Sequence, residues 1–157
     1  MNLLRKFLES TTILLFICII VLTLLQIVTR YFSLISLPWT EEVARLLLVW
    51  ATYFSVSIVI GRRDHIQVDF LHKLLPKRLQ VFNDFFVEIL FLVFSFVAMY
   101  FGYLVSEAAS TDYNTSLKYS SALFYLPIPI SGFFNLFFIS KNIAALAKSI
   151  AKKDVRP

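Results

Sequence analysis

The sequence predicts an all-α membrane protein with four transmembrane helices, and three observations lead to this fold class. Hydrophobic residues make up 59% of the 157 residues, against about 45–50% in an ordinary globular domain. Charged residues make up only 16%. They stand between uncharged stretches of about the length that crosses a bilayer, roughly 20 residues. A soluble chain of this size has too little interior to hide so much apolar surface, so we expect a single four-helix membrane domain over residues 1–157.

The first predicted span covers residues 10–29, between Glu9 and Arg30. A basic start followed by an apolar run also resembles a signal peptide. However, the apolar region of a signal peptide needs only about 7–15 residues and is followed by a small-residue cleavage site. This run is longer and ends without such a site. We therefore expect a retained first helix.

The second predicted span covers residues 40–61. Pro38 stands just ahead of it, and Glu41 and Glu42 fall in its first turn, where the helix dipole favours negative charge. Arg45 shortens the uncharged stretch, but its long side chain can reach the membrane interface. These signals predict that the helix starts near residue 40.

The third and fourth predicted spans cover residues 84–106 and 124–144. Pro127 and Pro129 lie near the start of the fourth, and proline is tolerated in the first turn of a helix. The regular part of the fourth helix is therefore expected to begin at these prolines.

A short amphipathic helix is expected at the membrane interface between the second and third spans, over residues 64–75. Apolar residues recur there at helical spacing among charged ones, and Pro76 would end the helix.

The distribution of basic residues predicts the orientation. Of the fifteen Lys and Arg residues, three (Arg30, Arg45 and Lys118) lie on one side of the predicted membrane and twelve on the other. The positive-inside rule then places both termini and the middle loop in the cytoplasm. In a membrane protein such basic groups set topology and meet lipid headgroups, so nucleic acid is not an expected partner.

Metal and cofactor chemistry find little support in the sequence. His65, Asp69 and His72 share one face of the expected interfacial helix and could ligate a metal, but no second element completes a site. Both histidines lie outside the spans, which excludes haem ligation within the membrane. We therefore expect a polar rim there and no cofactor in this chain.

Enzymatic and autonomous transport functions are also not expected. The sequence contains no G-x-S-x-G or H-E-x-x-H motif. A carrier working alone needs ionisable groups at membrane depth, and no span has a charge at its centre. The nearest candidate, Glu88, is expected in the headgroup region.

Two features instead indicate helix packing or partner contacts. Ala98, Gly102 and Ser106 form a ladder of small residues that allows close approach of a helix, from this chain or from a partner. A second cluster lies at the start of the second span, where Glu41 and Arg45 have the spacing of an ion pair. Its other members are Trp39, which would also fit an aromatic belt, and Glu42.

Three segments resemble a known family. Trp-Thr-Glu-Glu-Val-Ala-Arg at 39–45, Gly-Arg-Arg-Asp-His-Ile-Gln-Val-Asp at 61–69 and Leu-Pro-Ile-Pro at 126–129 resemble the DctQ-type small permease subunit of tripartite ATP-independent periplasmic (TRAP) transporters. The likeness covers almost the whole chain.

The resemblance implies a non-catalytic scaffold in the bacterial inner membrane. Its large multi-span partner would hold the sodium and substrate sites and move as an elevator. A periplasmic binding protein, which the small subunit would help to dock, would deliver an organic anion such as a sialic acid or a C4-dicarboxylate. Because the sequence stops at Pro157, we expect the large partner to be a separate protein.

The resemblance also implies roles for individual residues. Trp39, Glu42 and Arg45 would stabilise the outer end of the second helix or its contact with the large subunit. Arg62, His65 and Asp69 would fix the cytoplasmic turn and the interfacial helix. The alternative is a small transporter or channel that works alone as a homo-oligomer. It would need a polar stripe lining a pore, which we do not find in the sequence.

Overall fold

The regular secondary structure of the described residues is helical. The computed structural model describes residues 2–33, 38–62, 76–113 and 118–154. Its elements are α1 (Asn2–Ser33), α2 (Pro38–Arg62), α4 (Lys77–Ala108), the 3-10 turn η1 (Ala109–Thr111), α5 (Ala122–Tyr125) and α6 (Pro127–Asp154).

Within these described ranges, four helical segments are long and apolar enough to cross a membrane: Leu3–Phe32, Pro38–Arg62, Phe82–Thr111 and Ala122–Ala147. The first three predicted spans lie inside α1, α2 and α4. The fourth, predicted over residues 124–144, begins inside α5, and α6 then starts at Pro127. The expected interfacial helix at 64–75 lies outside the described residues.

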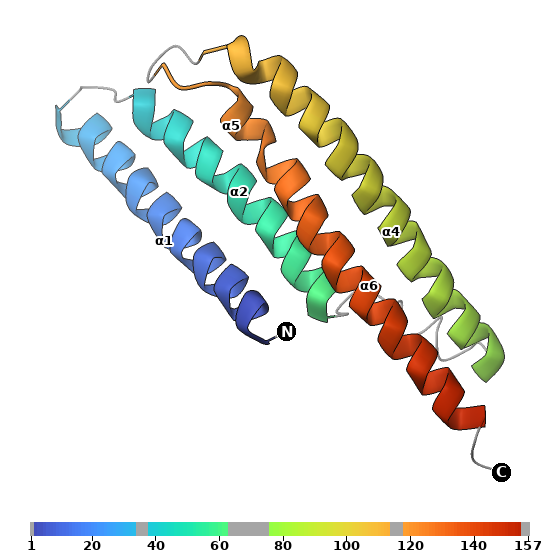
Figure 1. Cartoon of the computed structure of the whole chain (residues 1–157). Coiled ribbons are helices and arrows are strands. Elements are labelled where there is room, and N and C mark those ends of the chain that lie inside the picture. The colour runs from blue at the N-terminus through green and yellow to red at the C-terminus, as the bar shows by residue number, and fades with distance from the viewer. Residues whose placement is uncertain (1, 34–37, 63–75, 114–117, 155–157) are drawn as a thin grey trace.

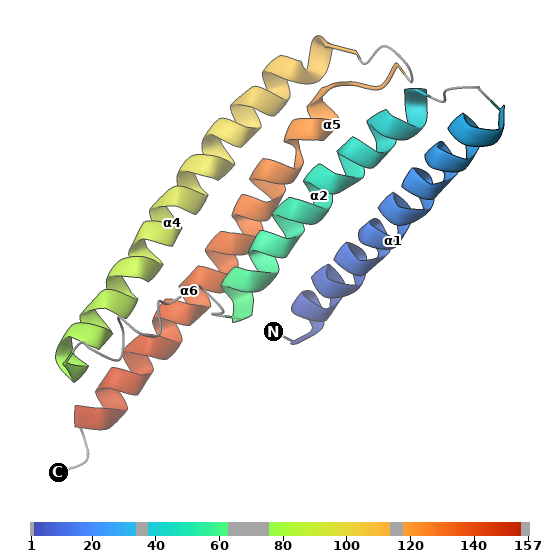
Figure 2. The same ribbon diagram turned by 180° about the vertical axis from the view of Figure 1, so that it is seen from behind.

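The long helices lie side by side in a single row. The helix α1 packs on α2, α2 on α6, and α6 on α4 (Figure 1). The view from behind shows the same order reversed (Figure 2). This arrangement is an open row and not a closed bundle. It leaves two broad faces, and most of the large apolar side chains of α1 and α4 are exposed on them.

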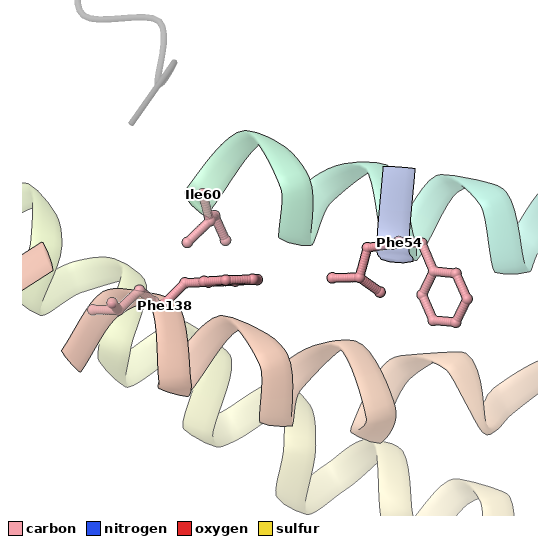
Figure 3. Packing of buried hydrophobic residues seen from close by; sticks show 5 residues of the cluster. Phe54, Ile60 and Phe138 are labelled. Carbon is pink, nitrogen blue, oxygen red and sulfur yellow. The ribbon is translucent and has the colours of Figure 1, made fainter. Parts of the chain in front are cut away.

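The centre of the row is the seam between α2 and α6. Phe54 and Ile60 of α2 and Phe138 of α6 point into this seam (Figure 3) and belong to the buried hydrophobic cluster. Gly61 allows the approach, because a Cβ atom there would lie 3.3 Å from the Phe138 ring. Leu8 extends the cluster to α1.

Buried polar side chains also join α2 to α6. The amide of Asn142 donates a hydrogen bond to the carbonyl of Ile60 at 3.1 Å. The hydroxyl of Ser57 donates to the carbonyl of Ser131 at 3.4 Å. Leaving such groups unpaired away from water costs free energy. These hydrogen bonds therefore act together with the apolar contacts to hold α2 against α6.

Glycines set the distance between α4 and α6. A Cβ atom on Gly102 would lie 2.7 Å from Cγ2 of Ile128 and 3.0 Å from Cδ of Pro129. On Gly132 it would lie 2.9 Å from Cβ of Met99. Real Cβ atoms do not come this close to other carbons, so both positions need glycine for the observed packing.

The break between α5 and α6 has a local chemical cause. In a continuous helix the carbonyl of Leu123 would accept a hydrogen bond from the backbone N–H of residue 127, but Pro127 has no N–H. The indole Nε1 of Trp50 in α2 donates to this carbonyl instead, at 3.1 Å. Trp50 thereby satisfies the carbonyl that the proline leaves without a backbone donor, and it ties α5 to α2.

Candidate partner interface

The cluster predicted at the start of α2 divides into two parts. On the exposed side, Nη2 of Arg45 lies 2.9 Å from Oε1 of Glu41 and donates a hydrogen bond to it. Both side chains are largely exposed, so this pair alone contributes little to stability in water. Trp39, with 38% of its surface exposed, lies at the same end of the helix.

Glu42 is placed differently from Glu41. Its side chain is half-buried. Its Oε2 atom is shielded from solvent and accepts no hydrogen bond within the part of the chain that the structure describes. A carboxylate oxygen in this position is an acceptor without a donor.

Glu42 and Arg45 also border a groove of about 680 Å³ between α2 and the α5–α6 corner. Trp39 and Glu41 lie outside its lining. The groove is lined by Glu42, Arg45, Val49, Tyr53, Ser121, Phe124, Tyr125 and Ile128.

Arg62, at the opposite end of α2, joins two helices. Its Nη2 atom lies 2.7 Å from Oε1 of Glu9 in α1, and its Nε atom donates to the same oxygen at 3.2 Å. Nε of Arg5 lies 3.3 Å from that oxygen. His65 and Asp69, predicted to act with Arg62, lie outside the described residues.

The small-residue ladder of α4 faces α6 of the same chain at Gly102. The hydroxyl of Ser106 donates to the Gly102 carbonyl at 2.7 Å, and both residues are buried. Ala98 is half-buried. At Gly102 the close approach that the ladder permits is therefore used for internal packing.

Several residues of the seams were missed in the sequence analysis. Trp50, Ser131 and Asn142 each take part in a hydrogen bond between elements. The side chain of Glu88, which was expected among headgroups, is buried against other residues of the chain, with 5% of its surface exposed. One available signal was the spacing of Ser131, Asn135 and Asn142, polar residues at helical intervals in an apolar run. Another was the position of Pro127 four residues after Leu123.

Among the described residues, no group of three or more His, Cys, Asp or Glu side chains is placed to hold a metal ion. The end of the molecule near Trp39 instead presents a surface with the features of a binding site. It consists of a groove with aromatic walls, an acidic acceptor at its edge and an exposed ion pair beside it. Such a surface is suited to binding another macromolecule.

Comparison with known families identifies the class of protein. The family model described as "Tripartite ATP-independent periplasmic transporters, DctQ component" matches residues 19–149. The chain therefore belongs to the DctQ family, the small permease components of TRAP transporters, which are not enzymes. This confirms the resemblance found in the sequence.

Individual relatives are distant. The chain is 29% identical over 136 residues to the sialic acid TRAP transporter permease protein SiaT of Haemophilus influenzae, covering 87% of this chain and 22% of that protein. It is 28% identical over 123 residues to the sialic acid TRAP transporter small permease protein SiaQ of Vibrio cholerae, covering 78% and 71%.

A third relative carries a different substrate name. The isethionate TRAP transporter permease protein DctMQ of Oleidesulfovibrio alaskensis is 30% identical over 95 residues, or 59% of this chain and 15% of that protein. The chain thus spans less than a quarter of the length of both SiaT and DctMQ.

Proposed function

We propose that this chain is the stationary scaffold subunit of a sodium-driven transporter that imports an organic anion across the bacterial inner membrane. The large multi-span subunit would carry the sodium and substrate sites and the moving elevator. The small subunit would enlarge the fixed part of the complex and help to dock the periplasmic binding protein. The observation that carries the proposal is the family match over residues 19–149.

The construction of the row supports a fixed role. Each seam is held by contacts that tolerate little sliding: an ion pair between α1 and α2, hydrogen bonds between α2 and α6, and glycine contacts between α4 and α6. Displacing α4 along α6 would drive side chains into the space that Gly102 and Gly132 leave. A rigid row with two broad apolar faces is suited to supporting a moving neighbour.

The proposed orientation has both termini and the middle loop in the cytoplasm, on the basis of the twelve basic residues on that side. The Trp39 end of the row would then face the periplasm, where a binding protein arrives. Two of the three relatives are named for sialic acid, so a sialic acid is the first substrate to test and a C4-dicarboxylate the second.

The alternative of an autonomous homo-oligomeric transporter was suggested by the small-residue ladder. Because Gly102 packs against Ile128 and Pro129 of the same chain, the ladder no longer favours that alternative.

Affinity purification from native membranes tests the scaffold proposal. The tagged chain is expected to bring down a large multi-span permease in a stable complex. Recovery of the chain alone, stable and competent in transport by itself, would contradict the proposal.

The exposed ion pair provides a point mutation for the same complex. We expect Arg45→Ala to lower complex assembly or substrate uptake while membrane insertion stays intact, because it removes the partner of Glu41 and one of the residues that line the groove. Arg30→Ala is the control, since Arg30 is an exposed cation predicted on the same side of the membrane. Unchanged uptake in cells that carry Arg45→Ala would count against a role for this cluster.

A further inference from the structure

We propose that the seam between α4 and α6 binds one water molecule, held by the hydroxyl of Ser95 and the side-chain carbonyl of Asn135. The two residues lie near the middle of the candidate spans Phe82–Thr111 and Ala122–Ala147. At that depth a bilayer offers no bulk water to a polar group. The inference concerns this chain by itself, so it stands independently of the proposed function.

The register of the two helices places Ser95 opposite Asn135. Gly102 of α4 packs against Ile128 of α6, and the two helices run antiparallel (Figure 1). Ser95 lies seven residues before Gly102. Asn135 lies seven residues after Ile128. Seven residues make about two helical turns, so a step of this length along both helices leads from one facing pair to the next.

Both side chains are buried, and each carries a polar atom without a partner. Ser95 has 1% of its surface exposed and Asn135 has 5%. Within the part of the chain that the structure describes, neither Oγ of Ser95 nor Oδ1 of Asn135 forms a hydrogen bond. Four other helical serines instead donate to the carbonyl four residues earlier: Ser55, Ser57, Ser106 and Ser140. Unpaired polar atoms in an apolar seam cost free energy, and a ligand that pairs with both would remove this cost.

Water fits the chemistry of these two atoms. The Ser95 hydroxyl can donate a hydrogen bond, whereas Oδ1 of Asn135 only accepts. One water molecule can accept from the first and donate to the second. Gly132 leaves the carbonyl oxygen of Ser95 uncovered as a further acceptor, since a Cβ atom on Gly132 would lie 3.1 Å from it. A buried water needs two to four polar partners of this kind.

A sodium ion fits the same place less well. Its charge would be buried, and a buried charge is costly unless an opposite charge pairs with it. The acidic residue of α4 that is closest to Ser95 in the sequence is Glu88, two turns away. The neutral ligand is therefore the one that the seam favours.

Nuclear magnetic resonance on the full chain in lipid nanodiscs tests for the water directly. A water molecule that stays bound gives nuclear Overhauser cross-peaks between the water resonance and nearby amide protons of isotope-labelled protein. We expect such peaks at the backbone amide of Ser95 and the side-chain amide of Asn135. Ser57 is the matched control, because it is also a buried serine but its hydroxyl already donates to protein carbonyls. Spectra without these peaks at Ser95 and Asn135 would overturn the inference.

A larger side chain can take the place of the water. Ser95→Asn adds an amide group of about the size of one water molecule, and this amide can donate to Asn135. A group that reproduces the hydrogen bonds of a bound water can displace it without loss, so we expect a melting temperature at or above that of Ser140→Asn, the matched control on the exposed face of α6. A melting temperature several degrees lower would mean that the seam has no room for a water.

A double-mutant cycle tests whether the two residues share a ligand. Ser95→Ala and Asn135→Leu each leave one polar atom in the seam, and each should raise the unfolding equilibrium constant roughly fivefold to tenfold. The double variant needs no water, so its effect should be at least fivefold smaller than the product of the two single effects. Unfolding in a denaturing detergent measures all three. Single effects that simply multiply would contradict a shared ligand.

Two further outcomes would identify other partners for these atoms, and either would overturn the inference. A melting temperature that rises with sodium but not with potassium at constant ionic strength would show a cation site. Coupling in the cycle without water cross-peaks would show a direct hydrogen bond between Ser95 and Asn135. Should a substituted chain fail to fold, the resonance measurement on the wild-type chain still decides the question.

Discussion

Single residues determine how closely neighbouring helices approach in this row. At Gly102 a Cβ atom would come within 2.7 Å of Ile128, and at Gly61 within 3.3 Å of Phe138. In a membrane, helices gain little from hiding apolar surface from water, so close van der Waals packing at small residues and hydrogen bonds between helices supply the attraction. The free energy that holds the row together therefore depends strongly on a few small side chains.

Enlarging Gly102 is expected to separate α4 from α6. Gly102→Val places a branched side chain against Ile128 and Pro129, and overpacking of this kind costs about 1–3 kcal/mol. Thermal unfolding of the purified protein in detergent measures the loss. Ala108→Val, at an exposed residue of the same helix, controls for the helix propensity of valine. Equal melting temperatures for the two variants would show that the Gly102 contact does not hold the row together.

At the scale of elements, the α5–α6 corner depends on a hydrogen bond from another helix. Pro127 removes the backbone donor of the Leu123 carbonyl, and Trp50 replaces it at 3.1 Å. The same corner forms one wall of the groove, so the position of α5 relative to α2 determines the shape of the candidate interface.

A double-mutant cycle tests this replacement. Trp50→Phe keeps an aromatic ring but removes the N–H, and we expect a loss of about 1–2 kcal/mol in the free energy of unfolding, because a buried carbonyl is left without a donor. In a Pro127→Ala background the loss should be smaller, since the substitution restores a backbone N–H within reach of the Leu123 carbonyl. Unfolding in a denaturing detergent measures both. An equal cost in the two backgrounds would contradict the explanation.

The four long helices, but not their lateral order, could be predicted from the sequence. Charged residues such as Arg30 and Lys118 are costly inside a bilayer and therefore lie near the span ends. Pro127 likewise marked the start of α6 because proline is restricted to the first turn. The lateral order depends on which side chain packs against which glycine, as Met99 packs against Gly132. A single sequence does not show which residues of different helices are in contact.

The candidate site was likewise predicted only in its local part. The ion pair of Glu41 and Arg45 was expected from their spacing, and the structure places Nη2 of Arg45 2.9 Å from Oε1 of Glu41. That Glu42, the adjacent residue, would be turned towards a groove was not expected. Its surroundings include residues of α5 and α6 about eighty positions later in the chain. Local spacing carries no information on such contacts.

At the scale of the whole molecule, the single row is the feature that most distinguishes this chain from a self-contained transporter. A closed bundle can enclose a substrate pathway between its helices, whereas the row presents its surface outwards on two faces. Its helices therefore gain their remaining contacts from lipid or from a neighbouring protein.

Spin-label distances test the row directly. With Cys18 replaced by Ala, labels at Ile17 in the middle of α1 and Phe94 in the middle of α4, both exposed, report the width of the layer. Adjacent helix axes lie 8–10 Å apart, so three steps along a row predict roughly 25–30 Å between these axes. Pulsed electron spin resonance on the protein in lipid nanodiscs gives the distance. A value corresponding to one or two steps would indicate a closed bundle.

We propose that this chain is a required component of a transporter but does not itself carry the substrate. Uptake of a labelled sialic acid into proteoliposomes under an inward sodium gradient tests it most directly. Vesicles would hold this chain alone, the large permease alone, or both, each with the periplasmic binding protein present. We expect uptake only when both membrane proteins are present. Uptake by this chain alone, or full uptake by the large permease without it, would show that the chain is not such a scaffold.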